Sequence, residues 1–187
     1  MEYKEYKPTA FYQAFIDSFW VFKVYATGNL TFPIQHESLP DSCLSIVTIH
    51  QPYYTGVRML GPYSQKFERE IYANSIYIGV RFHPWIDFGP VIPSKKELVN
   101  QTAAAPPAVE QIFNPLVGDA SNLNYSIDRL ERITRRFLNF SAISTTQNEL
   151  VRFICMELNS QKPIGEIVAL LPASSREILR KFKEETG

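Results

Sequence analysis

Two kinds of apolar spacing divide the chain, and the change between them falls near residue 100. Before it, short runs rich in aromatic and β-branched residues occupy positions 19–25, 44–49 and 71–82. Turn signals separate these runs, at Gly28-Asn29, Gln51-Pro52, Gly61-Pro62 and Pro84. Short strands between turns are typical of a β-sandwich or barrel, so we expect a β-rich first half.

After residue 94 the apolar residues recur at helical spacing. The three sets are Val109, Ile112 and Phe113; Ile127, Leu130, Ile133, Phe137 and Leu138; and Leu150, Val151, Ile154 and Leu158. Each set predicts one apolar face of an amphipathic helix. Residues 102–107 are small and proline-rich, as a connection between domains is, and Pro107 suits the first turn of the next helix.

The end of the chain has the order of a helix-turn-helix unit. Residues 164–171 predict a short apolar helix, and a sharp turn follows it. Ser174 is suited to cap a second helix, which Gly187 would end. We therefore expect an α+β chain in three parts: a cupin-like β-sandwich or barrel at 1–101, a helical connector at 102–142, and a helix-turn-helix subdomain at 143–187.

The amino-acid composition says little about which molecules the protein binds. Lysines and arginines balance aspartates and glutamates at 19 each, so the net charge names no partner. Residues 163–187 hold four basic and four acidic side chains, which predicts weak electrostatic attraction to DNA. The predicted helix 126–140 carries four arginines opposite its apolar face: Arg129, Arg132, Arg135 and Arg136. We expect these arginines to face solvent; contact with DNA phosphates is the less favoured interpretation.

The N-terminus is charged and lacks the apolar stretch of a signal peptide, and no run approaches the ~18 apolar residues of a membrane span. We expect a soluble, cytoplasmic protein without membrane contact. Cys43 and Cys155 lie in segments of different character, which favours two reduced thiols over a disulfide or metal site.

The chain offers little for catalysis. His36, His50 and His83 lie in the β-rich half without a His-x-His pair or a Glu at ligand spacing, so isolated histidines are favoured over a metal site. Nucleophile-elbow glycines, a Gly-rich phosphate loop and paired carboxylates are all missing from the sequence. We expect no enzyme and no cofactor, and a small cupin-like enzyme remains an alternative only if those three histidines hold a metal.

The C-terminal residues resemble the first helix-turn-helix of the AraC/XylS family of bacterial transcription regulators. The family pattern falls on Ile167, Val168, Ala173, Ser174, Arg176, Ile178, Arg180, Phe182 and Gly187. The resemblance implies that DNA is contacted by Ser174, Ser175, Arg176, Leu179, Arg180 and Lys183. Arg176, Leu179 and Arg180 fall where the family reaches base edges, and Ser175 and Lys183 would meet phosphate.

The N-terminal half resembles the sensor-like domain of unknown function that precedes this unit in one branch of the family. The segments that carry the resemblance are 6–8, 15–20, 39–47 and 79–84. If the barrel encloses a pocket, Trp20, Cys43, Arg81 and His83 would line it, with Arg81 as the partner of an anionic small-molecule effector. The family resemblance also implies a homodimer.

Two positions depart from the family pattern, because Pro172 replaces the turn glycine and Val168 replaces a small alanine. The second helix-turn-helix of the family is absent from the sequence, which favours a fragment of a longer regulator over a naturally short one. We expect the chain to bind DNA weakly by itself. The alternative is a protein-interaction module that does not bind DNA, which a continuous apolar patch around Leu179 would favour.

Overall fold

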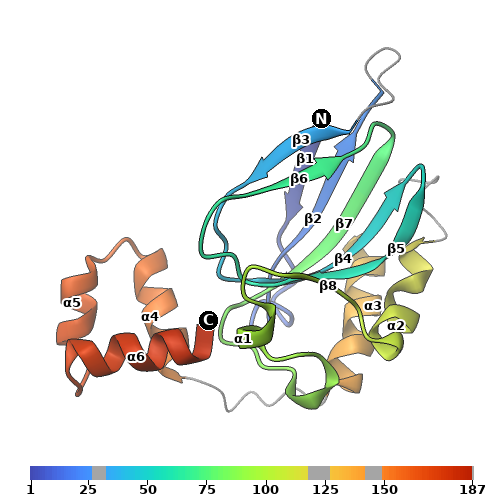
Figure 1. Cartoon of the computed structure of the whole chain (residues 1–187). Helices are drawn as coiled ribbons and strands as arrows, with labels where there is room; N and C mark the ends of the chain where they lie inside the picture. The colour runs from blue at the N-terminus through green and yellow to red at the C-terminus, as the bar shows by residue number, and fades with distance from the viewer. Residues whose placement is uncertain (27–32, 118–126, 142–148, 187) are drawn as a thin grey trace.

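A computed structural model of the chain describes residues 1–26, 33–117, 127–141 and 149–186 (Figure 1). The strands are β1 (Glu2–Tyr6), β2 (Ile16–Val24), β3 (Ile34–Ser38), β4 (Leu44–Gln51), β5 (Tyr54–Leu60), β6 (Phe67–Ile71), β7 (Ser75–Phe82) and β8 (Thr102–Ala104). The helices are the 3-10 helix η1 (Gly89–Val91), α1 (Lys95–Leu98), α2 (Pro107–Val117), α3 (Ile127–Phe140), α4 (Glu149–Asn159), α5 (Ile164–Ala169) and α6 (Ser175–Thr186). The fold is therefore α+β, with a helical C-terminal region.

Six strands form one sheet in the order β1-β2-β7-β4-β5-β8, and β3 pairs with β6 in a separate two-stranded ribbon. Every pair among these strands is antiparallel. The central strand β7 pairs with β2 on one side and with β4 on the other. Segments that are far apart in the sequence therefore lie side by side in the sheet. A binding site in the N-terminal half would therefore be formed in part by side chains of this sheet.

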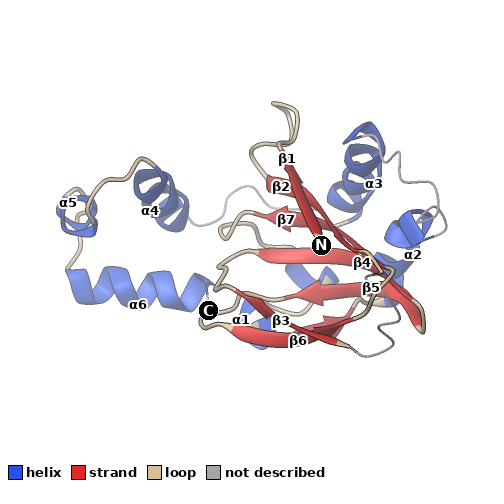
Figure 2. Ribbon diagram, turned by 90° about the horizontal axis from the view of Figure 1, so that it is seen from above, coloured by secondary structure: helices blue, strands red, loops and turns tan. Residues whose placement is uncertain are grey.

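The two faces of the sheet bury different sets of side chains, because successive residues of a strand point to opposite faces. α2 and α3 cover one face of the sheet (Figure 2). Ile78, Val80 and Phe82 of β7 belong to the core that includes residues of these two helices. Phe82 meets Phe137 of α3 there, with ring centroids 5.7 Å apart. Tyr77 points to the other face, which the β3–β6 ribbon covers. The sheet thus lies between two cores, and α2 and α3 belong to the larger one.

The last three helices, α4 to α6, have a small core of their own. Ile154, Ile167 and Ile178, one from each helix, are buried against one another. Ser174 Oγ accepts a hydrogen bond from the Glu177 amide at 3.3 Å, so the predicted N-cap of α6 is confirmed. Figure 1 shows this group beside the sheet, with α6 running towards α1.

The expected helices are present. The apolar sets near 109–113, 127–138 and 150–158 fall in α2, α3 and α4, and Pro107 is the first residue of α2. None of the helices in the described parts of the chain is long and apolar enough to cross a bilayer. The expected break at Gly28-Asn29 and the expected helix stop at Gly187 lie outside the described residues.

The strand predictions need correction in several places. The run at 71–82 is not one strand, because β6 ends at Ile71, a turn follows in which Asn74 has φ 57°, and β7 begins at Ser75. Asparagine tolerates this left-handed backbone better than most residues do, which makes it a turn signal. β1, β3, β5 and β8 were not predicted. β8 lies beyond the expected boundary at residue 101 and pairs with β5.

Candidate functional site

A cavity of about 610 Å³ lies between the sheet and the β3–β6 ribbon. Trp20, Phe22 and Tyr77 line it from the sheet, and His36, Phe67 and Arg69 line it from the ribbon. Four residues of the segment that leads into β4 also line it, and so does Tyr63; the four are Leu39, Pro40, Asp41 and Cys43. A volume of this size is in the range of sites that take a small molecule, roughly 300–1,000 Å³.

Aromatic rings make up much of the wall. Tyr63 and Phe67 stack at 3.6 Å between ring centroids, and Phe22 packs against both His36, at 5.0 Å, and Tyr77, at 5.7 Å. These contacts hold the rings in place and make the cavity lining largely aromatic.

Trp20 keeps its place because Gly79 lies opposite it on β7. A Cβ added at Gly79 would come within 2.1 Å of the indole Cε2, closer than any side chain allows. The missing side chain of Gly79 is therefore what lets the indole lie across the strand beside the cavity.

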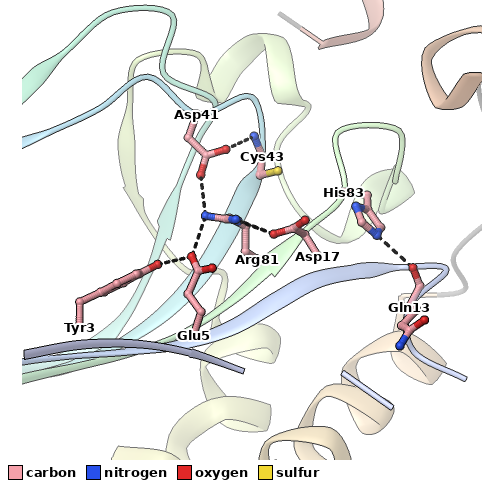
Figure 3. A network of polar contacts seen from close by, with 8 residues as sticks. All are labelled: Tyr3, Glu5, Gln13, Asp17, Asp41, Cys43, Arg81 and His83. Carbon is pink, nitrogen blue, oxygen red and sulfur yellow. Dashed lines mark hydrogen bonds and ion pairs between the residues drawn. The ribbon is translucent and has the colours of Figure 1, made fainter. Parts of the chain in front are cut away.

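Arg81 is held by three carboxylates at one end of the cavity (Figure 3). Its Nε and Nη2 both donate to Asp17 Oδ2, at 2.8 and 2.6 Å. Its Nη1 lies 3.3 Å from Glu5 Oε1 and 3.8 Å from Asp41 Oδ2. The β2 register shifts between Ile16 and Ser18, so Asp17 sits at an irregularity of the strand. This network ties β1, β2, β7 and the segment before β4 together.

The charges of the network shift the pKa values of its members and of the neighbouring Cys43. Burial disfavours both charged groups, but the mutual hydrogen bonds and attraction outweigh it, lowering the pKa of Asp17 and raising the pKa of Arg81. Burial and the nearby charge of Asp41 raise the pKa of the Cys43 thiol, so Cys43 is a neutral thiol at pH 7. A reactive cysteine is a thiolate, and the surroundings of Cys43 disfavour that form.

Arg69 of β6 is the second arginine of the cavity and has a different environment. Its Nη2 donates to Ser38 Oγ at 3.3 Å, and its guanidinium lies 4.7 Å from the centre of the Phe67 ring. Its Nε is buried without a hydrogen-bond partner. Among the described residues, Arg69 makes no ion pair with a carboxylate, and burial lowers its pKa.

The three histidines occupy three different environments. His36 lines the cavity, whereas His50 Nε2 lies 3.2 Å from the Leu116 carbonyl oxygen, next to α2. His83 stacks on Trp85, with centroids 4.2 Å apart, and its Nε2 is 3.0 Å from the Gln13 carbonyl oxygen (Figure 3). Burial lowers the pKa of all three. Within the described ranges, no three His, Cys, Asp or Glu side chains gather as a metal site would require.

The cavity brings together three of the four residues expected to line a pocket. Trp20, Cys43 and Arg81 are part of its lining, and His83 lies outside it. Sequence reasoning missed Arg69. The signal was the alternation of Phe67, Arg69 and Ile71 with Glu68 and Glu70, which places the arginine on the apolar side of a strand.

The residues expected to contact DNA all lie at the start of α6 or along it. Ser174, Ser175, Arg176, Leu179, Arg180 and Lys183 are exposed, while Ile178 on the same helix is buried. One exposed face of α6 therefore presents polar, basic and apolar groups together. Lys181 pairs with Glu177 at 3.5 Å, so part of the charge of the helix is balanced within it.

A family model described as a domain of unknown function (DUF6597) matches residues 4–103, more than half of the chain. The matched range takes in the whole cavity lining from the sheet and the ribbon, except Tyr3. Neither the curated proteins nor the solved structures contain a significant match to the chain.

Proposed function

Since the chain belongs to the family described as domain of unknown function DUF6597, whose description assigns no activity, we propose a function from the molecule itself. The proposal is that the chain is part of a DNA-binding transcription regulator. In it, the β domain binds a small-molecule effector in its cavity, and α5 and α6 form a helix-turn-helix that contacts DNA.

The observation that carries the proposal is the construction of α6. Ile178 anchors the helix to α4 and α5, and the residues that resemble the base-contacting positions of AraC/XylS regulators are on its exposed side. The Ser174 cap fixes the start of the helix, where backbone N–H groups favour a phosphate. An anchored helix with Arg176 and Arg180 exposed has what major-groove recognition requires.

The cavity supports the sensing half of the proposal. It lies between the sheet and the ribbon, has aromatic lining residues, and contains an arginine without a carboxylate partner among the described residues. Pockets that bind small molecules combine mostly apolar walls with a few polar groups. The Cys43 thiol of this lining is neutral, which disfavours its use as a nucleophile.

Selection from random DNA duplexes at low salt tests the DNA-binding half. The wild-type chain should enrich a defined sequence, and the double variant Arg176→Ala/Arg180→Ala should enrich none, because an arginine paired to guanine provides ~1–3 kcal/mol of discrimination. The double variant Arg132→Ala/Arg135→Ala is the matched control. It removes the same charge from exposed positions of α3 and should leave the enrichment intact.

Failure of the wild-type chain to enrich any sequence would contradict the DNA-binding proposal. Equal loss in both double variants would reduce the interaction to nonspecific attraction by charge.

A second candidate function is docking of a protein partner by the C-terminal helices. Large apolar side chains are exposed there, with Ile164 at 63%, Leu170 at 58% and Leu179 at 64% of their full exposure. Several exposed apolar side chains in one region favour a surface that binds another protein. Under this alternative, Leu179→Ser would abolish partner binding, whereas Arg176→Ala/Arg180→Ala would leave it in place.

A further inference from the structure

We propose that the cavity binds a ring-bearing anion, such as an aromatic carboxylate, and that Arg69, not Arg81, receives its negative group. This inference rests on the effector-binding half of the proposed function and specifies its ligand.

Arg81 is poorly suited to bind an anion because neighbouring carboxylates already neutralise its positive charge. Three carboxylates lie within 3.8 Å of its guanidinium, against a single positive charge. Its Nε and Nη2 are used on Asp17 and its Nη1 faces Glu5 and Asp41. An arriving carboxylate would meet net negative charge at this end of the cavity.

Arg69 has the opposite environment. It lines the cavity, its Nε is buried and without a partner, and the described residues provide it with no carboxylate. Its neighbours on β6, Glu68 and Glu70, are exposed on the outer side of the ribbon. Apart from the hydrogen bond to Ser38, this half-buried guanidinium has lost hydration without gaining a counter-charge. An anion in the cavity would supply that counter-charge.

The groups around Arg69 restrict what else the ligand carries. Its guanidinium faces the Phe67 ring, Phe67 stacks on Tyr63, and His36 stacks on Phe22 across the ribbon from it. Burial and the charge of Arg69 lower the pKa of His36, which leaves His36 neutral at pH 7 and without a competing charge. Aromatic lining beside a cation favours a ligand that combines an apolar ring with an anionic group.

The test uses three acids and their primary amides with the full chain: benzoate, 3-phenylpropionate and indole-3-acetate against benzamide, 3-phenylpropionamide and indole-3-acetamide. Each amide keeps the ring and removes the charge. Binding is measured by calorimetry and by the shift in melting temperature. The best acid should bind at least about tenfold more tightly than its amide, as a charge-assisted hydrogen bond to arginine requires.

Variants then assign the charge to one residue. Arg69→Gln should reduce the preference for the acid to less than about twofold, and Arg69→Lys should retain part of it. Arg58→Gln is the matched control, because Arg58 also lies over an aromatic ring, Tyr54 at 4.9 Å, but does not line the cavity. It should leave the preference unchanged. Circular dichroism spectra that match wild type show that each variant is folded.

Three results would overturn the inference: equal binding of acids and amides, an acid preference that survives in Arg69→Gln, or no binding of any acid. These results are separable from failure of the regulator proposal. Acid binding through Arg69 together with DNA selection that enriches nothing would keep the cavity assignment and remove the DNA-binding assignment, and the reverse pattern would do the opposite.

Discussion

At the scale of single residues, two positions hold parts of the cavity lining in place. Gly79 makes room for the indole of Trp20, and Arg81 gathers three carboxylates from separate segments of the chain. Sequence reasoning found Trp20 and Arg81 as pocket residues. It did not find the carboxylates around Arg81, because Glu5, Asp17 and Asp41 are brought together only by sheet pairing across long sequence separations.

Replacement of Gly79 by alanine should displace the Trp20 indole. The added Cβ has no space, so we expect a loss of about 2–3 kcal/mol in the free energy of unfolding and a shifted tryptophan emission spectrum. Gly165→Ala is the control. Its Cβ would meet nothing within 4 Å in α5, and alanine is the better helix former there, so its stability should rise slightly. Equal stability of the two variants would contradict this account.

Asp17→Asn should make stability less dependent on acid. The pKa of Asp17 is lowered by Arg81 on folding, so its contribution is present above the unfolded-state pKa, near 3.9, and is lost as pH falls through the lower folded value. We expect the variant to lose ~1–2 kcal/mol at pH 7 and the gap to wild type to close as the pH falls below about 4. Thermal melts from pH 2 to 7 measure this. The control Glu68→Gln, at an exposed site, should have the same dependence of stability on pH as wild type. If Asp17→Asn were less stable than wild type by the same amount at every pH, the ion pair with Arg81 would not be the cause.

At the scale of elements, helices were predicted better than strands. The amphipathic stripes of α3 and α4 extend over several turns, and a stripe of that length specifies a helix by itself. β1 and β3 have charged or polar residues at most positions, and β8 has three small ones, so their pairing depends on neighbouring strands more than on their own pattern. The pairing of β3 with β6, which places Arg69 opposite His36, was therefore not predictable from the pattern of β3.

Loss of the Ser174 hydroxyl should weaken α6 at its start. Ser174→Ala removes the hydrogen bond to the Glu177 amide and should cost about 1 kcal/mol of helix stability. Amide hydrogen exchange in the first turn of α6 should accelerate accordingly. Ser175→Ala, one position along, removes an exposed hydroxyl that does not cap the helix and should leave exchange unchanged. Acceleration of equal size in both variants would contradict the cap assignment.

At the scale of the whole molecule, the hydrophobic residues form separate cores on either side of the sheet and a further one among α4 to α6. Phe137 of α3 contacts Phe82, Phe88 and Phe113 in the larger core, so α3 is joined to the sheet by aromatic packing. The sequence located this helix and its apolar face. It did not reveal the partner of that face, since apolar spacing does not specify what covers it.

Substitutions in different cores should therefore act on different parts of the chain. Phe137→Ala should destabilise the β domain by about 3–5 kcal/mol, seen as an earlier loss of tryptophan fluorescence. Ile178→Ala should instead lower the melting temperature of the C-terminal helices, followed by helical circular dichroism, and leave the tryptophan transition in place. A tryptophan transition shifted equally by both substitutions would show that the cores unfold together.

The proposal that α6 reads DNA sequence can be tested by fluorescence anisotropy with the selected duplex and a scrambled duplex, at two salt concentrations. We expect wild type to bind the selected duplex more tightly. Arg176→Ala/Arg180→Ala should lose that difference and Arg132→Ala/Arg135→Ala should keep it, because base contacts specify sequence whereas phosphate contacts only attract. Equal affinity of wild type for both duplexes would contradict the proposal.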